Sequence, residues 1–230
     1  SAHPYILLNY LGSPRDVMTL AHELGHGIHQ VLAAPQGQLI SGTPLTLAET
    51  ASVFGEMLTF RAILAAETRA PERRALLAGK VEDMLNTVVR QIAFHDFERQ
   101  VHDARKTGEL SFEQLRDIWL SVQRESLGPA FRFDDSYGAY WCYISHFLHV
   151  PFYVYAYAFG DCLVNALYNV YATKAVPDFV SKYQDMLSAG GRLRHKELLA
   201  PFRLDATDPD FWRRGMKTVS GFIDELERVA

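Results

Sequence analysis

Residues 13–27 read Ser-Pro-Arg-Asp-Val-Met-Thr-Leu-Ala-His-Glu-Leu-Gly-His-Gly, and this stretch predicts a helix that carries reactive side chains. Ser13 suits the N-cap, Pro14 suits the first turn, and Asp16 supplies the acid of a capping box three residues later. The helix is expected to continue to about Leu32, just before a Pro-Gln-Gly turn. The chain is therefore expected to place residues of this stretch on a well-defined helical face.

Two histidines four residues apart, His22 and His26, share that face, so both imidazoles can reach one metal ion. Glu23 lies beside the first of them but is displaced around the helix, where its carboxylate meets a water instead of the metal. Zinc lowers the pKa of such a water toward about 7, and a carboxylate can take its proton as it attacks a carbonyl. The motif predicts a zinc hydrolase with Glu23 as general base.

The alternative is a chance match, and the surrounding sequence argues against it. The motif lies inside a capped helix, and Gly25 and Gly27 stand in the middle of that helix. A glycine there costs about 1 kcal/mol relative to alanine. Two of them suggest the close approach of another backbone or of a substrate.

A catalytic zinc site needs a third protein ligand. A third histidine ten residues after His22 would be typical, but the chain has Leu32 there, and His29 stands where that longer pattern has glycine. Glu49 and Glu56 share one face of a second predicted helix. Because two antiparallel helices can bring Glu49 opposite the histidines, we predict Glu49 as the ligand. Glu56 is either an acid that holds an imidazole or a solvated surface acid.

A competing group of side chains lies on a third predicted helix, where His95, Glu98 and His102 fall near one face. Such groups on one helix more often form internal hydrogen bonds than bind a metal. We therefore expect no metal there.

The chain as a whole is predicted to be mainly α, a single catalytic domain over residues 1–230 with one short β-strand. The strand is expected at Tyr5–Tyr10, either as an edge that a peptide can extend or as an ordinary buried strand. The remaining helices are expected at Thr43 or Thr46 to Thr68, Pro71 to Gly108, Ser111 to Gly128, Pro151 to Tyr171, Pro177 to Leu187 and Asp208 to Val229.

Composition excludes several classes of partner. The formal net charge is −4 and the basic residues form no stripe, so nucleic acid is not expected. Ser136–Gly160 has no formal charge, but its tyrosines and histidines argue for an interior aromatic wall and against a membrane span. Cys142 and Cys162 are expected to be buried thiols, not a disulfide. Ser1-Ala2-His3-Pro4 lacks the features of a signal peptide.

Several motifs together resemble one known family. They are His3-Pro4-Tyr5 with the helix through His26, Ala48–Ser52, Ser145–Phe147 with Pro151–Gly160, and Asp208–Trp212. This combination is similar to the catalytic region of the oligoendopeptidase F family, which are zinc peptidases like thimet oligopeptidase. The resemblance implies a mostly helical fold and one Zn2+ per chain, held by two His and one Glu. It also implies cleavage of short peptides in a deep channel, usually in the cytoplasm. Family members are longer, so the chain resembles their C-terminal catalytic part.

The aromatic segment carries a further candidate group. His149, Tyr153 and Tyr157 recur every four residues, which on one helix forms a stripe typical of core packing. The resemblance implies instead that His146, Tyr153 and Tyr157 bind substrate and stabilise the oxyanion of peptide hydrolysis. A register shift of one or two residues leaves Tyr155 and His149 as alternatives.

The function predicted from these features is a zinc metalloendopeptidase that hydrolyses oligopeptides. One alternative is a related helical zinc carboxypeptidase, although no Arg or Lys stands out to bind a terminal carboxylate. Another is a metal-stabilised module that binds peptides without hydrolysing them, and the intact Glu23 argues against it.

Overall fold

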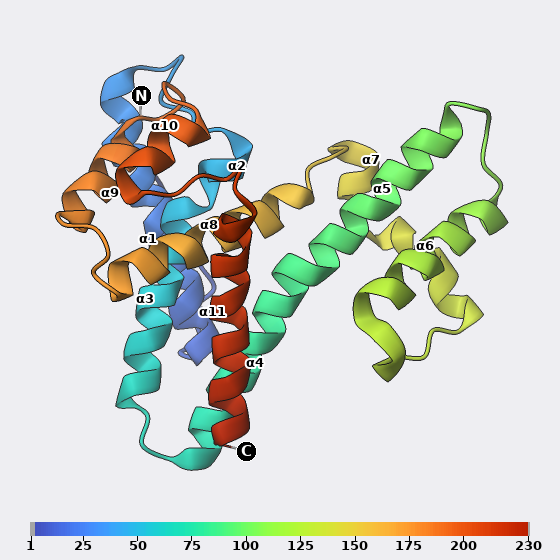
Figure 1. The fold of residues 1–230 in the computed structure, drawn as a ribbon, viewed down its shortest axis with the longest axis horizontal. Helices are drawn as coiled ribbons and strands as arrows, with labels where there is room; N and C mark the ends of the chain where they lie inside the picture. The colour runs from blue at the N-terminus through green and yellow to red at the C-terminus, as the bar shows by residue number, and fades with distance from the viewer. Residues whose placement is uncertain (1–2, 230) are drawn as a thin grey trace. The chain divides into compact units, whose positions relative to one another are not determined.

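The computed structural model describes residues 3–229, and these residues contain helices and loops but no β-strand (Figure 1). The α-helices are α1 (Pro14–Ala33), α2 (Leu45–Ala48), α3 (Thr50–Ala66), α4 (Ala70–Leu85), α5 (Gln91–Arg105), α6 (Phe112–Leu127), α7 (His146–His149), α8 (Tyr155–Ala172), α9 (Phe179–Ser188), α10 (His195–Leu199) and α11 (Pro209–Arg228). Short 3-10 segments cover Ala34–Gln36, Gly128–Ala130, Asp135–Tyr143 and Ala200–Phe202, and a π-helical turn covers Asn86–Arg90. The mainly α prediction is confirmed.

The described residues form two compact units. Residues 3–82 and 160–229 form the first unit, and Asp83–Phe159 forms the second. The first contains α1, α2, α3, α9, α10, α11 and most of α4 and α8, whereas the second contains α5, α6 and α7. One catalytic domain over residues 1–230 stays a prediction. The expectation that the first residues are not a signal peptide concerns Ser1 and Ala2, which lie outside the described residues.

Capping boxes begin two helices at the residues predicted for them, Ser13 and Ser111. At α1, the Asp16 N–H donates to Ser13 Oγ (3.2 Å) and the Ser13 N–H donates to Asp16 Oδ2 (2.8 Å). At α6, Ser111 and Gln114 form the same reciprocal pair, at 3.3 and 2.8 Å. These bonds satisfy backbone N–H groups that the first turn of a helix leaves without partners.

The predicted strand is absent. Residues 5–10 have no regular structure, and the side chains of Tyr5 and Leu7 are 79% and 98% exposed. A strand needs a neighbouring strand to pair its backbone N–H and C=O groups. The described part of the chain contains none, so the β-branched and aromatic side chains of this segment are not sufficient to form one.

Two helices expected to be continuous are interrupted. The second predicted helix divides at Glu49, whose backbone has φ −85° and ψ 1°, which places α2 before it and α3 after it. The third continues through a π-helical turn at Asn86–Arg90. Both changes redirect side chains that the sequence pattern placed on one uninterrupted face.

A third interruption separates the predicted stripe of aromatic residues. The helix expected from Pro151 begins only at Tyr155, because Phe152 adopts a left-handed conformation with φ 59°. His149 ends α7, Tyr153 lies in the connection, and Tyr157 lies in α8. These three residues therefore do not share a helical face.

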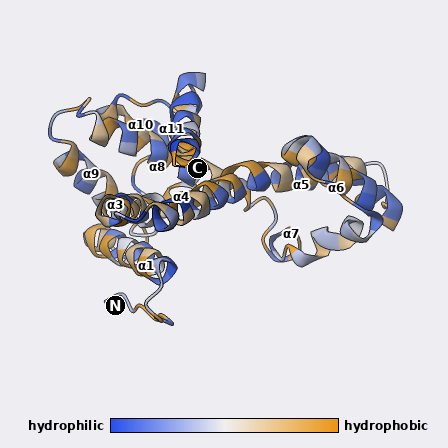
Figure 2. Ribbon diagram, turned by 90° about the horizontal axis from the view of Figure 1, so that it is seen from below, coloured by the Kyte–Doolittle hydropathy of each residue, from blue (hydrophilic) through white to orange (hydrophobic). Residues whose placement is uncertain are grey.

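Aromatic packing fixes α3 within the first unit. The ring of Phe54 lies 4.7–6.2 Å, centroid to centroid, from four rings on α8 and α9. Those rings belong to Tyr168, Tyr171, Phe179 and Tyr183. At the other end of α3, Phe60 packs against Phe222 of α11 at 5.6 Å. Figure 2 shows that α1 of the same unit carries both apolar and polar residues, as expected for a helix with one face in a core.

The second unit has its own core, in which Trp119 of α6 is fully buried. Its buried members are Phe94, Phe97, Trp119, Leu120, Val122 and Val154. Phe147 of α7 packs against this cluster, with its ring 5.1 Å from that of Phe97 and 5.9 Å from that of Phe94. The core therefore anchors the turn that also carries His146.

The prediction of an interior wall is wrong for the first part of Ser136–Gly160. Tyr140 and Tyr143 are 53% and 81% exposed. Only one side of this segment packs inward, where Tyr137 meets Trp119 at 5.9 Å. Both cysteines are free thiols, but Cys142 is exposed and only the Cys162 thiol is buried. Within residues 3–229, none of the helices has the length and apolar character needed to cross a bilayer.

Candidate metal centre

The site begins with the close contact between α1 and α3, and Gly25 lies where the two backbones meet. A Cβ atom at Gly25 would lie 2.5 Å from the carbonyl oxygen of Ala51 and 2.6 Å from Cα of Ser52. The predicted close approach of a backbone is therefore confirmed at Gly25. Gly27 differs, because its nearest neighbour would be the Ile6 side chain at an ordinary 3.7 Å.

We expect Gly25→Ala to lower the free energy of unfolding by about 1–3 kcal/mol, because the added methyl forces the two helix backbones apart. Gly221 of α11 is a matched control, since a Cβ there would meet nothing within 4 Å. Gly221→Ala should raise stability by up to ~1 kcal/mol by removing backbone entropy from the unfolded chain. Thermal unfolding without metal measures both. Equal effects from the two substitutions would contradict the packing argument.

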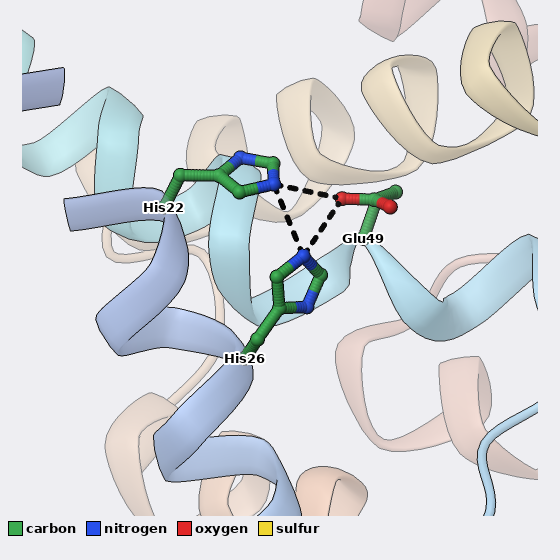
Figure 3. A group of neighbouring side chains, drawn as sticks. All are labelled: His22, His26 and Glu49. Carbon is green, nitrogen blue, oxygen red and sulfur yellow. Dashed lines mark hydrogen bonds and ion pairs between the residues drawn. The ribbon is translucent and has the colours of Figure 1, made fainter. Parts of the chain in front are cut away.

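Three side chains converge beside this contact, two from α1 and one from the break between α2 and α3 (Figure 3). The Nε2 atoms of His22 and His26 lie 3.0 Å apart, and each lies 3.4 Å from Oε2 of Glu49. Zinc binds such nitrogens and oxygens at 2.0–2.2 Å, so two ligands of a tetrahedral ion are about 3.3 Å apart. The chemistry and the spacing of the three donors therefore fit zinc.

The three donors are neither sealed inside the protein nor fully exposed. The side chains of His22, His26 and Glu49 are 26%, 36% and 22% exposed. A site closed on all sides is typical of structural zinc, whereas a catalytic site keeps one position open. The partial exposure is consistent with access for a substrate.

Glu56 of α3 contacts His22 at the ring nitrogen that faces away from the other two donors. Its Oε1 lies 2.5 Å from Nδ1 of His22, which leaves Nε2 of that ring directed toward Glu49. Burial lowers the pKa of His22, while Glu56, Glu49 and Glu23 raise it, and the resulting pKa lies above the ordinary 6.5. A carboxylate on the far ring nitrogen of a metal-binding histidine fixes its tautomer and increases its basicity.

Two residues to which the sequence analysis assigned no role at the site lie against Glu49. The Ser52 hydroxyl, which is fully buried, donates to Oε2 of Glu49 at 2.8 Å. Gly160 provides space beside the same side chain, since a Cβ there would lie 3.3 Å from Cβ of Glu49. Ser52 follows Glu49 by three residues, the spacing of a helical first turn, and this spacing was the available signal.

The other candidates near the motif have different surroundings. Glu23 is half-buried on α1 and contributes to the electrostatic field that raises the pKa of His22. His29 is buried and its Nε2 is 3.1 Å from the Thr43 hydroxyl; burial, followed by the nearby His26, lowers its pKa. Among residues 3–229, the donors that lie close enough together to bind a metal do not include His29.

The competing group on α5 contacts residues of the segment that leads into α8. Glu98 accepts the Phe152 N–H at 2.6 Å, and the ring of His102 lies 4.7 Å from that of Phe152. His95 packs against Tyr155 at 5.5 Å. In the described part of the chain, this group does not form a cluster of metal donors.

The second unit nevertheless brings together three residues that the sequence analysis had selected. The His146 ring lies 5.3 Å from that of Tyr153 and 5.8 Å from that of Tyr157, and the two tyrosine rings are 5.3 Å apart. The Tyr157 hydroxyl is 3.3 Å from Nε2 of His146. His149 is exposed and outside this group. The turn at Phe152, and not a continuous helix, assembles the cluster.

Known proteins similar to the chain identify its family. The model of the family described as Peptidase family M3 matches residues 1–218. Oligopeptidase PepF of Bacillus subtilis is 29% identical over 229 residues, which are 99% of this chain and 34% of that protein. The chromosomal oligoendopeptidase F of Lactococcus lactis subsp. cremoris is 28% identical over 227 residues, 98% of this chain and 37% of that protein.

A solved structure shows the same fold. Oligoendopeptidase-F from Enterococcus faecium matches with a TM-score of 0.79 and 25% identity, over 94% of this chain and 39% of that one. The chain thus spans about a third of the length of the curated relatives it matches. The family model and these similarities lead to one conclusion. The chain belongs to peptidase family M3, in the group of oligoendopeptidase F.

Proposed function

We propose that this chain carries the zinc site of an oligopeptidase and hydrolyses short peptides. The observation that supports the proposal most directly is the triangle of His22, His26 and Glu49 donor atoms, with edges of 3.0–3.4 Å. A bound zinc ion acts as a Lewis acid on the peptide carbonyl and lowers the pKa of water. The family membership supports the same reaction class.

The remaining roles belong to side chains that do not bind the metal. We assign Glu23 as the general base, which takes a proton from the attacking water and returns it to the departing amine. Glu56 keeps Nδ1 of His22 engaged, so that Nε2 is available as a ligand. Ser52 restrains the ligand oxygen of Glu49. Short peptides as substrates, and a cytoplasmic location, follow from the similarity to oligoendopeptidases and are part of the proposal.

The test of this function is metal-dependent hydrolysis by the 230-residue chain. With one equivalent of zinc, we expect the chain to cleave a quenched fluorescent peptide of about ten residues. A strong chelator should abolish cleavage, because the bound metal supplies the Lewis acid, and added zinc should restore it. Hydrolysis that continues in the chelator after zinc is shown to be absent would contradict the proposal.

The cluster in the second unit has a proposed role as well. We assign the Tyr157 hydroxyl as a donor to the oxyanion of the tetrahedral intermediate, with His146 and Tyr153 binding substrate beside it.

We expect Tyr157→Phe to lower kcat by about 10–1000-fold with little change in KM, because a donor to the oxyanion acts mainly in the transition state. Zinc content should be unchanged. Tyr171→Phe, which changes a tyrosine that packs beside Phe54 in the first unit, is the control. If Tyr157→Phe has the same kcat as the parent, the Tyr157 hydroxyl is not a donor to the oxyanion.

A further inference from the structure

Glu98 is an unusual residue to find inside the second unit. Its side chain is 2% exposed, in the middle of α5. No ion pair involving Glu98 is found among the described residues, and its Oε2 atom is buried without a hydrogen-bond partner there. Burying a carboxyl group in this way costs several kcal/mol unless another interaction offsets the cost. The other oxygen provides that interaction.

Oε1 of Glu98 accepts the backbone N–H of Phe152 at 2.6 Å. Phe152 has φ 59°, a conformation that costs a residue with a Cβ about 1–2 kcal/mol and is rare for bulky side chains. Rings from α5 hold the Phe152 side chain too, with His102 at 4.7 Å and His95 at 6.1 Å. The buried carboxyl group thus stabilises a backbone conformation that the sequence itself disfavours.

The turn that Glu98 contacts connects the segments that carry His146, Tyr153 and Tyr157. Phe152 lies between α7, which begins at His146, and α8, which carries Tyr157. Tyr153 is the next residue. The left-handed turn therefore sets the distances among three rings that lie 5.3–5.8 Å apart.

We propose that Glu98 is a positioning residue for the reaction: it holds the turn at Phe152, and thereby the arrangement of His146, Tyr153 and Tyr157. The role rests on the proposed function, in which these three residues act on the substrate. Glu98 itself touches no reacting atom. Its removal should therefore affect turnover through geometry, and misplacing a catalytic group by ~1 Å can cost about 100-fold in rate.

The test compares two substitutions of similar size. Glu98→Leu removes the acceptor but fills the same space, and we expect kcat to fall by about 10–100-fold while KM changes little. Glu98→Gln keeps an oxygen for the Phe152 N–H and should stay within about threefold of the parent. Zinc affinity, which depends on residues of the first unit, should be the same in all three proteins. Unchanged kcat in Glu98→Leu would overturn the proposal.

A second change tests the mechanism. Glycine adopts positive φ without a Cβ penalty, so adding Phe152→Gly to Glu98→Leu should recover part of the lost kcat. Loss of global stability would not be repaired in this way, because the added substitution also removes ring contacts with His95 and His102. If the double variant has a lower kcat than Glu98→Leu alone, the proposed action through the turn is wrong.

Amide hydrogen exchange separates this inference from the proposed function. Loss of a bond to a carboxylate should speed exchange at Phe152 by about 10–100-fold in Glu98→Leu, independent of any catalysis. If the parent cleaves no peptide, the proposed function fails, while the exchange rates still decide whether Glu98 holds the turn. Unchanged exchange at Phe152 would overturn the positioning role even in an active enzyme.

Discussion

Glu49→Ala should abolish tight zinc binding, with a loss of affinity of at least ~1000-fold, whereas Glu56→Ala should cost about 10–100-fold. The reason is geometric. Oε2 of Glu49 lies 3.4 Å from both imidazole Nε2 atoms, so it occupies one corner of the donor triangle. Glu56 contacts the far nitrogen of His22 and acts through that ring.

Competition between each variant and a chromophoric chelator measures these affinities at one pH. His29→Ala is the matched control, because His29 lies on the same helix but pairs with Thr43 and stands outside the donor group. It should keep its zinc affinity within a fewfold of the parent, although the lost hydrogen bond lowers stability by about 1 kcal/mol. Helical circular dichroism of the metal-free proteins shows whether each variant folds. Should Glu49→Ala retain zinc more tightly than Glu56→Ala, the assignment of the third ligand would be wrong.

The features that could be predicted from the sequence are the local ones. The capping boxes at Ser13 and Ser111 depend on side chains three residues apart, and both helices begin at the residues that the sequence analysis gave. The histidines His22 and His26 share a face because a helix repeats every 3.6 residues, and their Nε2 atoms do meet. Local spacing was sufficient for both the helix and two of the three donors.

The features that could not be predicted depend on distant parts of the chain. Residues 5–10 have the composition of a strand, but strand formation requires a partner that spacing along the chain does not reveal. The left-handed turn at Phe152 donates a hydrogen bond to Glu98, which lies on α5 and is far away in the sequence. A pattern that assumes a straight helix through residues 149–157 cannot include such a contact. That pattern included His149, which lies outside the ring cluster, whereas His146 was selected from the family resemblance.

The interruption of the second predicted helix at Glu49 changes the direction of a side chain at the site. Sequence periodicity placed Glu49 and Glu56 on one face of a single helix, but Glu49 stands outside α3, with ψ near 1°. Its side chain points toward the two histidines (Figure 3). The Ser52 hydroxyl donates to its Oε2, and Gly160 leaves space beside its Cβ. The sequence analysis placed Glu49 opposite the histidines by pairing two helices, and its role as a ligand stays a prediction. The position of Gly160 beside it comes from packing that only the structure shows.

Glu23→Gln should leave zinc bound at close to one equivalent and lower kcat for peptide cleavage by at least ~100-fold. The amide has nearly the size and shape of the carboxylate, so α1 and its histidines should stay in place. It cannot accept the proton of the attacking water at neutral pH. Because a general base is needed only as the reaction proceeds, KM should change little.

The comparison with Glu49→Ala makes this prediction specific. Both variants should be nearly inactive, but one loses the metal and the other keeps it, so zinc content distinguishes a base from a ligand. Glu82→Gln, an exposed acid on α4 of the same unit, controls for the general effect of removing one negative charge. It should retain both zinc and turnover. Loss of zinc in Glu23→Gln would make Glu23 part of the metal shell, and parental turnover with zinc bound would require another residue to take the proton.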